Sequence, residues 1–144
     1  MAFEDDVMDA VEVVLLQVDG VDRVYKEIGK PGNAYEPDTA RIKVMGFPSV
    51  INWTHQREEI QEFEVVIMVG NAYSTSSDKQ ALAHLRMRSF INLIEGEDNA
   101  SLGGIVDDVT WSNKDSGVGE LKLDVKGEWA GAVGTIATNR MVVR

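Results

Sequence analysis

Hydrophobic residues recur at steps of three and four in two segments, and this spacing predicts amphipathic helices. The first segment, residues 3–18, begins with acidic side chains that suit the positive end of a helix dipole, and Gly20 follows it. In the second, SSDKQALAHLRMRSFINLIEGED, Ser76 or Ser77 can cap the first turn and Gly96 ends the helix. The chain is therefore expected to contain two helices, each with one apolar face.

Alternation of apolar and polar residues predicts strands in the remaining segments, with 112–119 turning the chain. These strands are, in order, residues 21–28, 40–53, 59–70, 105–111, 120–129 and 133–143. They group around the two helices instead of alternating with them, which favours an α+β fold. We expect one domain over residues 1–144, with an antiparallel sheet packed against two helices.

Two stretches between these elements are expected to be loops. Residues 29–38 carry glycine, proline and asparagine, which favour turns. Gly46 and Pro48 interrupt the second strand, and residues 45–59 are expected to form a long, irregular loop. Exposed apolar groups in a loop need a partner, so this loop is the candidate contact surface. Its candidate interface residues are Phe47, Val50, Ile51, Trp53, His55 and Arg57.

The composition argues against several classes of function. The 144 residues carry a net charge of −10, which argues against binding to the phosphate backbone of DNA but would let a duplex slide past without sticking. The absence of cysteine excludes disulfides, thiolate catalysis and sulfur-ligated metals. The acidic N-terminus and the lack of a long apolar run predict neither export nor membrane insertion, and cytoplasm is the expected compartment.

The titratable residues do not form a catalytic pattern. Asp107 and Asp108 are neighbours on a predicted strand, so their side chains point to opposite faces and cannot share a substrate or a metal. His55 and His84 lack the spacing of metal ligands, and no glycine-rich nucleotide motif is present. No cofactor or metal is expected, and the direct interpretation is a non-enzymatic interaction module.

Arg86 lies among apolar neighbours on the second helix, which makes it the unusual charge of that face. It is expected either to find a buried or inter-subunit partner such as Asp107, or to extend its charged end into solvent. We include it among the candidate interface residues.

Several segments together resemble the tail terminator, or tail-completion, proteins of long-tailed bacteriophages. The similarity covers nearly the whole chain in the order of its elements, and LGGIVDD is its most specific string. The segments are GFPSVINW, EFEVVIMVG, DKQALAHLRMRSFINLIE, LGGIVDDVTW and EWAGAVGTIATNRMVVR.

The resemblance implies an α+β fold assembled as a hexameric ring in the virion tail, at its neck end. Such a ring caps the tail tube, stops its polymerisation and offers its other face to the head-completion (neck) protein, while DNA passes through the lumen. Assembly would take place in the host cytoplasm, and the family has no catalytic residues to transfer.

Two alternatives remain open at this point. The first is another head-to-tail connector or neck protein of related fold, which would bind head-side proteins instead of the tube. The second is an enzyme or small-molecule binder, which would need a deep polar pocket at Asp107, Arg86 or His84.

Overall fold

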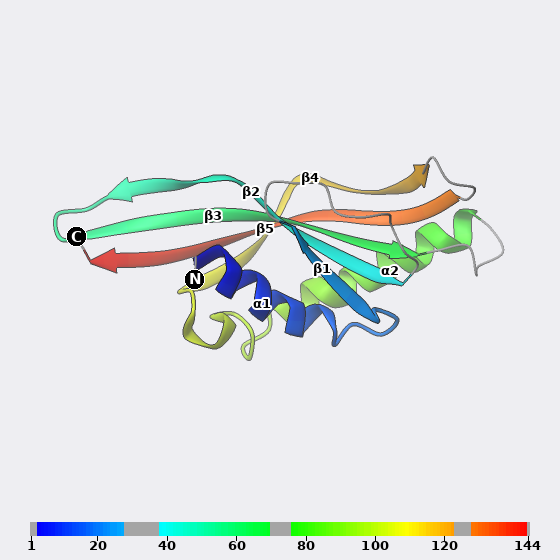
Figure 1. Cartoon of the computed structure of the whole chain (residues 1–144), viewed down its shortest axis with the longest axis horizontal. Helices are drawn as coiled ribbons and strands as arrows, with labels where there is room; N and C mark the ends of the chain where they lie inside the picture. Colours follow the sequence, from blue (N-terminus) through cyan, green and yellow to red (C-terminus); the bar gives the residue numbers. More distant parts are fainter. Residues whose placement is uncertain (1–2, 28–37, 70–75, 123–127, 144) are drawn as a thin grey trace.

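The protein folds into a five-stranded sheet with two helices, as a computed structural model of residues 3–27, 38–69, 76–122 and 128–143 describes (Figure 1). The expected α+β class is confirmed. The elements are α1 (Phe3–Leu15), β1 (Arg23–Glu27), β2 (Thr39–Asn52), β3 (Gln56–Val69), α2 (Ser76–Ile94), the 3-10 turn η1 (Leu102–Gly104), β4 (Asp108–Lys122) and β5 (Glu128–Val143).

The strand order across the sheet is β1-β2-β3-β5-β4. Strands β2, β3, β5 and β4 pair antiparallel, as expected, but β1 runs parallel to β2. The sheet is therefore mixed. An alternating pattern shows which side chains share a face, and it is the same for either strand direction, so it could not reveal this pairing.

Both helices cover the same face of the sheet. Helix α2 packs on β3, β4 and β5, whereas α1 packs on β1 and β2 and touches α2. The core lies between the layers and is centred on fully buried Phe63, Phe90 and Ile136. At the edge of the layer, the Lys26 ammonium donates to Asp9 at 2.6 Å, and this hydrogen bond raises the pKa of Lys26.

The last third of the chain holds two long strands where the pattern predicted three. Residues 112–119 do not turn the chain, because β4 continues from Asp108 to Lys122 with an irregularity between Ser112 and Gly117. Long pairing with β5 keeps this glycine-containing stretch extended, and the irregularity accommodates the residues that resemble a turn.

The stretch SLGGIVDD enters β4 by a tight turn instead of an extended strand. Gly103 and Gly104 have φ of 70° and 94°, which glycine adopts readily, and the strand begins only at Asp108. Asp107 precedes the strand. Its backbone N–H donates to Asn139 O, and its carboxylate accepts the Met141 N–H at 2.7 Å. A structural role therefore accounts for this carboxylate.

Some expectations concern residues outside the described part of the chain. These are the loop over 29–38 apart from Asp38, the capping side chains of Ser76 and Ser77, and the inward-facing side chains of 120–129, Trp129 among them.

Candidate functional site

The sheet extends beyond the helix layer as a three-stranded arm, which consists of residues 49–60 of the β2–β3 hairpin and residues 139–143 of β5. In Figure 1 the arm is at the left, past the N-terminal end of α1. Ser49 lies opposite Ile60, and Ile60 lies opposite Asn139, so the three strands are in continuous register. Strand β1 pairs with residues 39–43 of β2, and no described strand covers the outer edge of β2 beyond them.

The arm corrects the prediction of an irregular loop over residues 45–59. These residues form the paired ends of two 14-residue strands, joined by a tight turn in which the Trp53 N–H donates to Gln56 O at 2.8 Å. The interruption at Gly46 and Pro48 is real but local. It forms a bulge on an edge strand, where proline's missing N–H removes no bond from the sheet interior.

The bulge is held by one buried side chain. Three residues of β2, from Gly46 to Pro48, lie opposite the single residue Gln61 of β3, and Gly46 has a φ of 66°. Gln61 is 2% exposed, and its Nε2 lies 3.0 Å from Glu62 O, 3.1 Å from Met45 O and 3.4 Å from Gly46 O. Its amide therefore donates to backbone carbonyls of both strands at the bulge.

We expect Gln61→Met to loosen the base of the arm. Methionine has a similar volume but no donor, so the part-buried carbonyls of Met45 and Gly46 lose their partner, which should lower the free energy of unfolding by about 1 kcal/mol. Chemical denaturation gives the energy, and amide hydrogen exchange should accelerate over residues 45–52. Unchanged exchange there would show that the bulge does not depend on Gln61.

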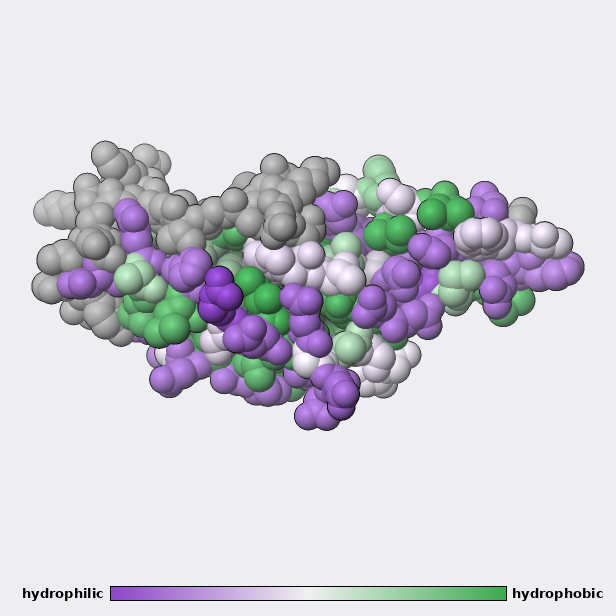
Figure 2. All heavy atoms as spheres, turned by 180° about the vertical axis from the view of Figure 1, so that it is seen from behind, coloured by the Kyte–Doolittle hydropathy of each residue, from purple (hydrophilic) through white to green (hydrophobic). Residues whose placement is uncertain are grey.

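The arm exposes large apolar side chains on both faces. Trp53 at the turn is 55% exposed, and Val50 and Ile51 are 46% and 45% exposed. Ile51 lies in register with Glu58 and Met141 on the face away from the helices, whereas Val50 lies in register with Glu59 on the helix side. Figure 2 shows the arm at its right, with hydrophobic side chains among hydrophilic ones.

Two further apolar residues of the arm, Met141 and Val143, were missed by the sequence analysis. They are 41% and 81% exposed. The final strand was recognised, but nothing in its own pattern shows that its end runs beside residues 56–58. Their membership of this surface comes from the pairing of β3 with β5.

The helix side of the arm is positively charged in an otherwise acidic protein. Glu59 accepts from Arg57 at 2.8 Å and from Arg140 at 2.9 Å, so two guanidinium groups share one carboxylate. The Arg140 guanidinium also lies 3.7 Å from the centre of the Phe3 ring of α1. Arg57 and the exposed His55 both lie on the arm, and their role as interface residues stays a prediction.

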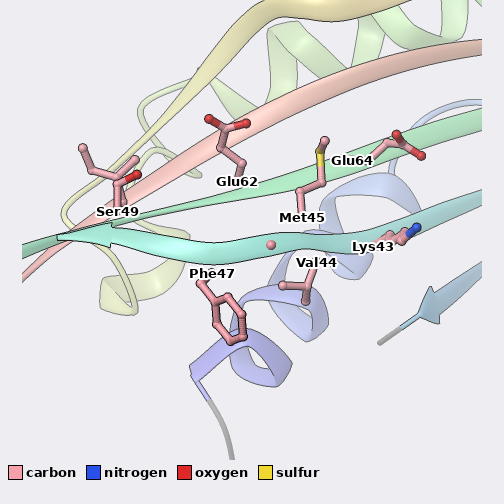
Figure 3. A pocket seen from close by; sticks show the side chains of 9 residues that line it. Lys43, Val44, Met45, Phe47, Ser49, Glu62 and Glu64 are labelled. Atoms are coloured by element: carbon pink, nitrogen blue, oxygen red, sulfur yellow. The ribbon is translucent and has the colours of Figure 1, made fainter. Parts of the chain in front are cut away.

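Phe47 lies at the base of the arm and is 97% exposed. Figure 3 shows it pointing to the same side as Val44, away from Met45 and Glu62. Met45 and Glu62, on the other side of the strand, line a shallow hollow of about 410 Å³ together with Lys43 and Glu64. Ser49 also lines the hollow. In the described residues, no three histidine and carboxylate side chains converge on a metal position.

Arg86 does not lie on the arm, and its role as an interface residue stays a prediction. Its side chain is buried on α2, and Nη1 donates to the Asp38 carboxylate at 2.7 Å. The expectation of a partner within the fold is confirmed, but the partner is Asp38 and not Asp107, and the alternative of a charged end in solvent is wrong. Asp38 lies 48 positions away in the sequence, at the start of β2, so no local pattern could have revealed the pairing.

Neither of the two described helices has the length and apolar character that a membrane span requires. His84 is exposed on α2. Compared with known protein families and with curated proteins, the chain matches no family model and no curated sequence.

Proposed function

We propose that this protein is a structural virion protein of a long-tailed bacteriophage, which caps the tail tube as a hexameric ring and joins it to the neck. The observation that carries the proposal is the arm, a rigid three-stranded projection whose apolar side chains Val50, Ile51 and Trp53 are about half exposed. Apolar residues clustered at the end of a projection are typical of a protein-binding surface.

The segments that carry the family resemblance are elements of this fold and of the turn that links them. The string LGGIVDD links α2 to β4, and the C-terminal segment is the strand β5 that joins the two halves of the sheet. The net charge of −10 supports a ring lumen through which DNA slides without binding. We therefore propose the tail tube protein and the head-completion protein as partners, with no catalytic role.

The test is a tube-length assay with polymerising tail-tube subunits. Addition of the purified protein should shorten the tubes and place a ring at one end, both visible by electron microscopy. Unaffected tubes together with binding to head-side proteins would favour a neck connector instead. Binding to neither partner would contradict the proposal.

Removal of one apolar side chain from the arm should weaken capping of the tail tube. In Trp53→Ala, loss of a half-exposed indole should leave the fold intact but reduce capping at least about tenfold, as expected for an aromatic anchor of an interface. Val13→Ala, which shortens an exposed residue of α1 outside the arm, is the matched control. Normal capping by Trp53→Ala would count against a contact role for the arm.

A further inference from the structure

A second unassigned surface lies on the helix layer. A hollow of about 440 Å³ opens between the segment that follows α1 and the middle of α2, and its lining consists of Asp19, Gly20, Leu82, Leu85, Arg86 and Ser89. We call it the helix groove. Leu85 is 62% exposed at its side, so a large apolar residue faces solvent there.

The groove has a rigid wall. The Arg86 guanidinium lies against Gly20 so closely that a Cβ atom on Gly20 would be 2.4 Å from Nη2. Asp38 holds that guanidinium from the other side, and the two charges offset each other. Among the residues that line the groove, the exposed Asp19 then leaves one net negative charge.

The arm and the groove are complementary in shape and charge. The arm is a projection with apolar residues, and its helix side has an excess of positive charge from Arg57 and Arg140 over Glu59, whereas Glu58 lies on the other face. The groove is a hollow with an exposed leucine and an excess of negative charge. Within one chain the arm points away from the helix groove (Figure 1), so the two surfaces cannot meet intramolecularly.

We propose that the arm of one copy docks in the helix groove of a second copy of this chain. The contact is head to tail, because each copy uses its arm on one neighbour and its groove on the other. Repetition of such a contact closes into a ring when the rotation between copies permits. The inference rests on the proposed function for its ring, and it adds which two surfaces form the subunit contact.

Each surface can be removed separately, and a mixture of the two variants makes the test specific. Trp53→Asp places a charge on the arm, and Leu85→Asp places one at the groove, both at exposed sites that should not affect folding. Each variant alone should lose self-association at least about tenfold in sedimentation experiments, whereas Val13→Asp should associate like the wild type.

A mixture of Trp53→Asp and Leu85→Asp should form a one-to-one dimer that grows no further. The Leu85→Asp chain supplies an intact arm, and the Trp53→Asp chain supplies an intact groove. If arms instead paired with arms, Leu85→Asp alone would associate normally and the mixture would form no mixed dimer. Either of these results would overturn the proposal.

Cross-linking gives an independent test, because the chain contains no cysteine and a single thiol can be introduced on each surface. Thr54→Cys marks the arm and Ser89→Cys marks the groove. A short thiol-to-thiol cross-linker should join the two proteins when they are mixed, and neither should cross-link efficiently to itself. Wild-type protein that remains monomeric at its highest soluble concentration, or the absence of the mixed product, would overturn the arm-to-groove contact.

The two proposals fail in different ways. Tubes capped by both surface variants as well as by the wild type would refute the arm-to-groove contact and leave the capping function intact. A mixed dimer and a ring that leaves tube length unchanged would refute the capping function and retain the subunit contact.

Discussion

Gly134→Ala is expected to lower the free energy of unfolding by about 3 kcal/mol, because no space exists for the added methyl group. Gly134 lies in β5, and the indole of Trp111 in β4 lies directly over it. An ideal Cβ would be 1.7 Å from Trp111 Cη2, far inside van der Waals contact. The indole would have to move, and with it the partly buried packing of Trp111 against the core.

Chemical denaturation of three variants isolates the effect. Gly96→Ala is the matched control, since its Cβ would meet backbone oxygens only at 3.3 Å or more, and we expect a change below about 1 kcal/mol. Trp111→Leu removes the obstruction, so the double variant Gly134→Ala/Trp111→Leu should be more stable than the sum of the single effects predicts. Strict additivity would show that the indole does not occupy the space above Gly134.

Gly20→Ala is expected to cost about 3 kcal/mol, from two separate causes. Gly20 has a φ of 92°, which is unfavourable for any residue with a Cβ, and the added methyl group would displace the Arg86 guanidinium. That group is buried and paired with Asp38, so it cannot move without weakening the ion pair between α2 and the start of β2.

Gly103→Ala separates the two causes. Gly103 has a φ of 70° and no atom within 4 Å of the added Cβ, so it measures the backbone cost alone, about 1 kcal/mol. The excess for Gly20→Ala is the cost of displacing Arg86, and it should fall when Arg86 is shortened to alanine in the same chain. Equal effects at the two glycines would contradict the described position of Arg86.

Gly20→Ala should also weaken self-association of the protein, because Gly20 lines the helix groove.

Local periodicity was sufficient for much of the fold. The spacing of apolar residues identified both helices, and the strand predicted over residues 59–70 contains Phe63, Val65 and Ile67, each of which is fully buried in β3. These patterns work because a helix or a strand repeats its side-chain direction over a few residues, so the core face is recorded in neighbouring positions. The α+β class followed from the order of the elements.

The candidate interface residues were chosen in part for a reason that the structure revised. Val50, Ile51 and Trp53 are exposed, as expected, but they belong to a paired hairpin because the Gly46–Pro48 interruption is absorbed in a bulge that Gln61 satisfies. A glycine and a proline close together indicate that a strand is interrupted, but the same two residues fit either a turn or a bulge. The choice between them depends on the partner strand.

The sequence by itself determined which segments are helical or extended, which of their faces are apolar, and the acidic charge of the whole. Only the tertiary structure decided the parallel pairing of β1, the continuity of β4, the arm that unites residues 49–60 with 139–143, and the pairing of Arg86 with Asp38. Each of these joins positions far apart in the chain, and such contacts depend on how the elements pack together, which local side-chain periodicity does not record.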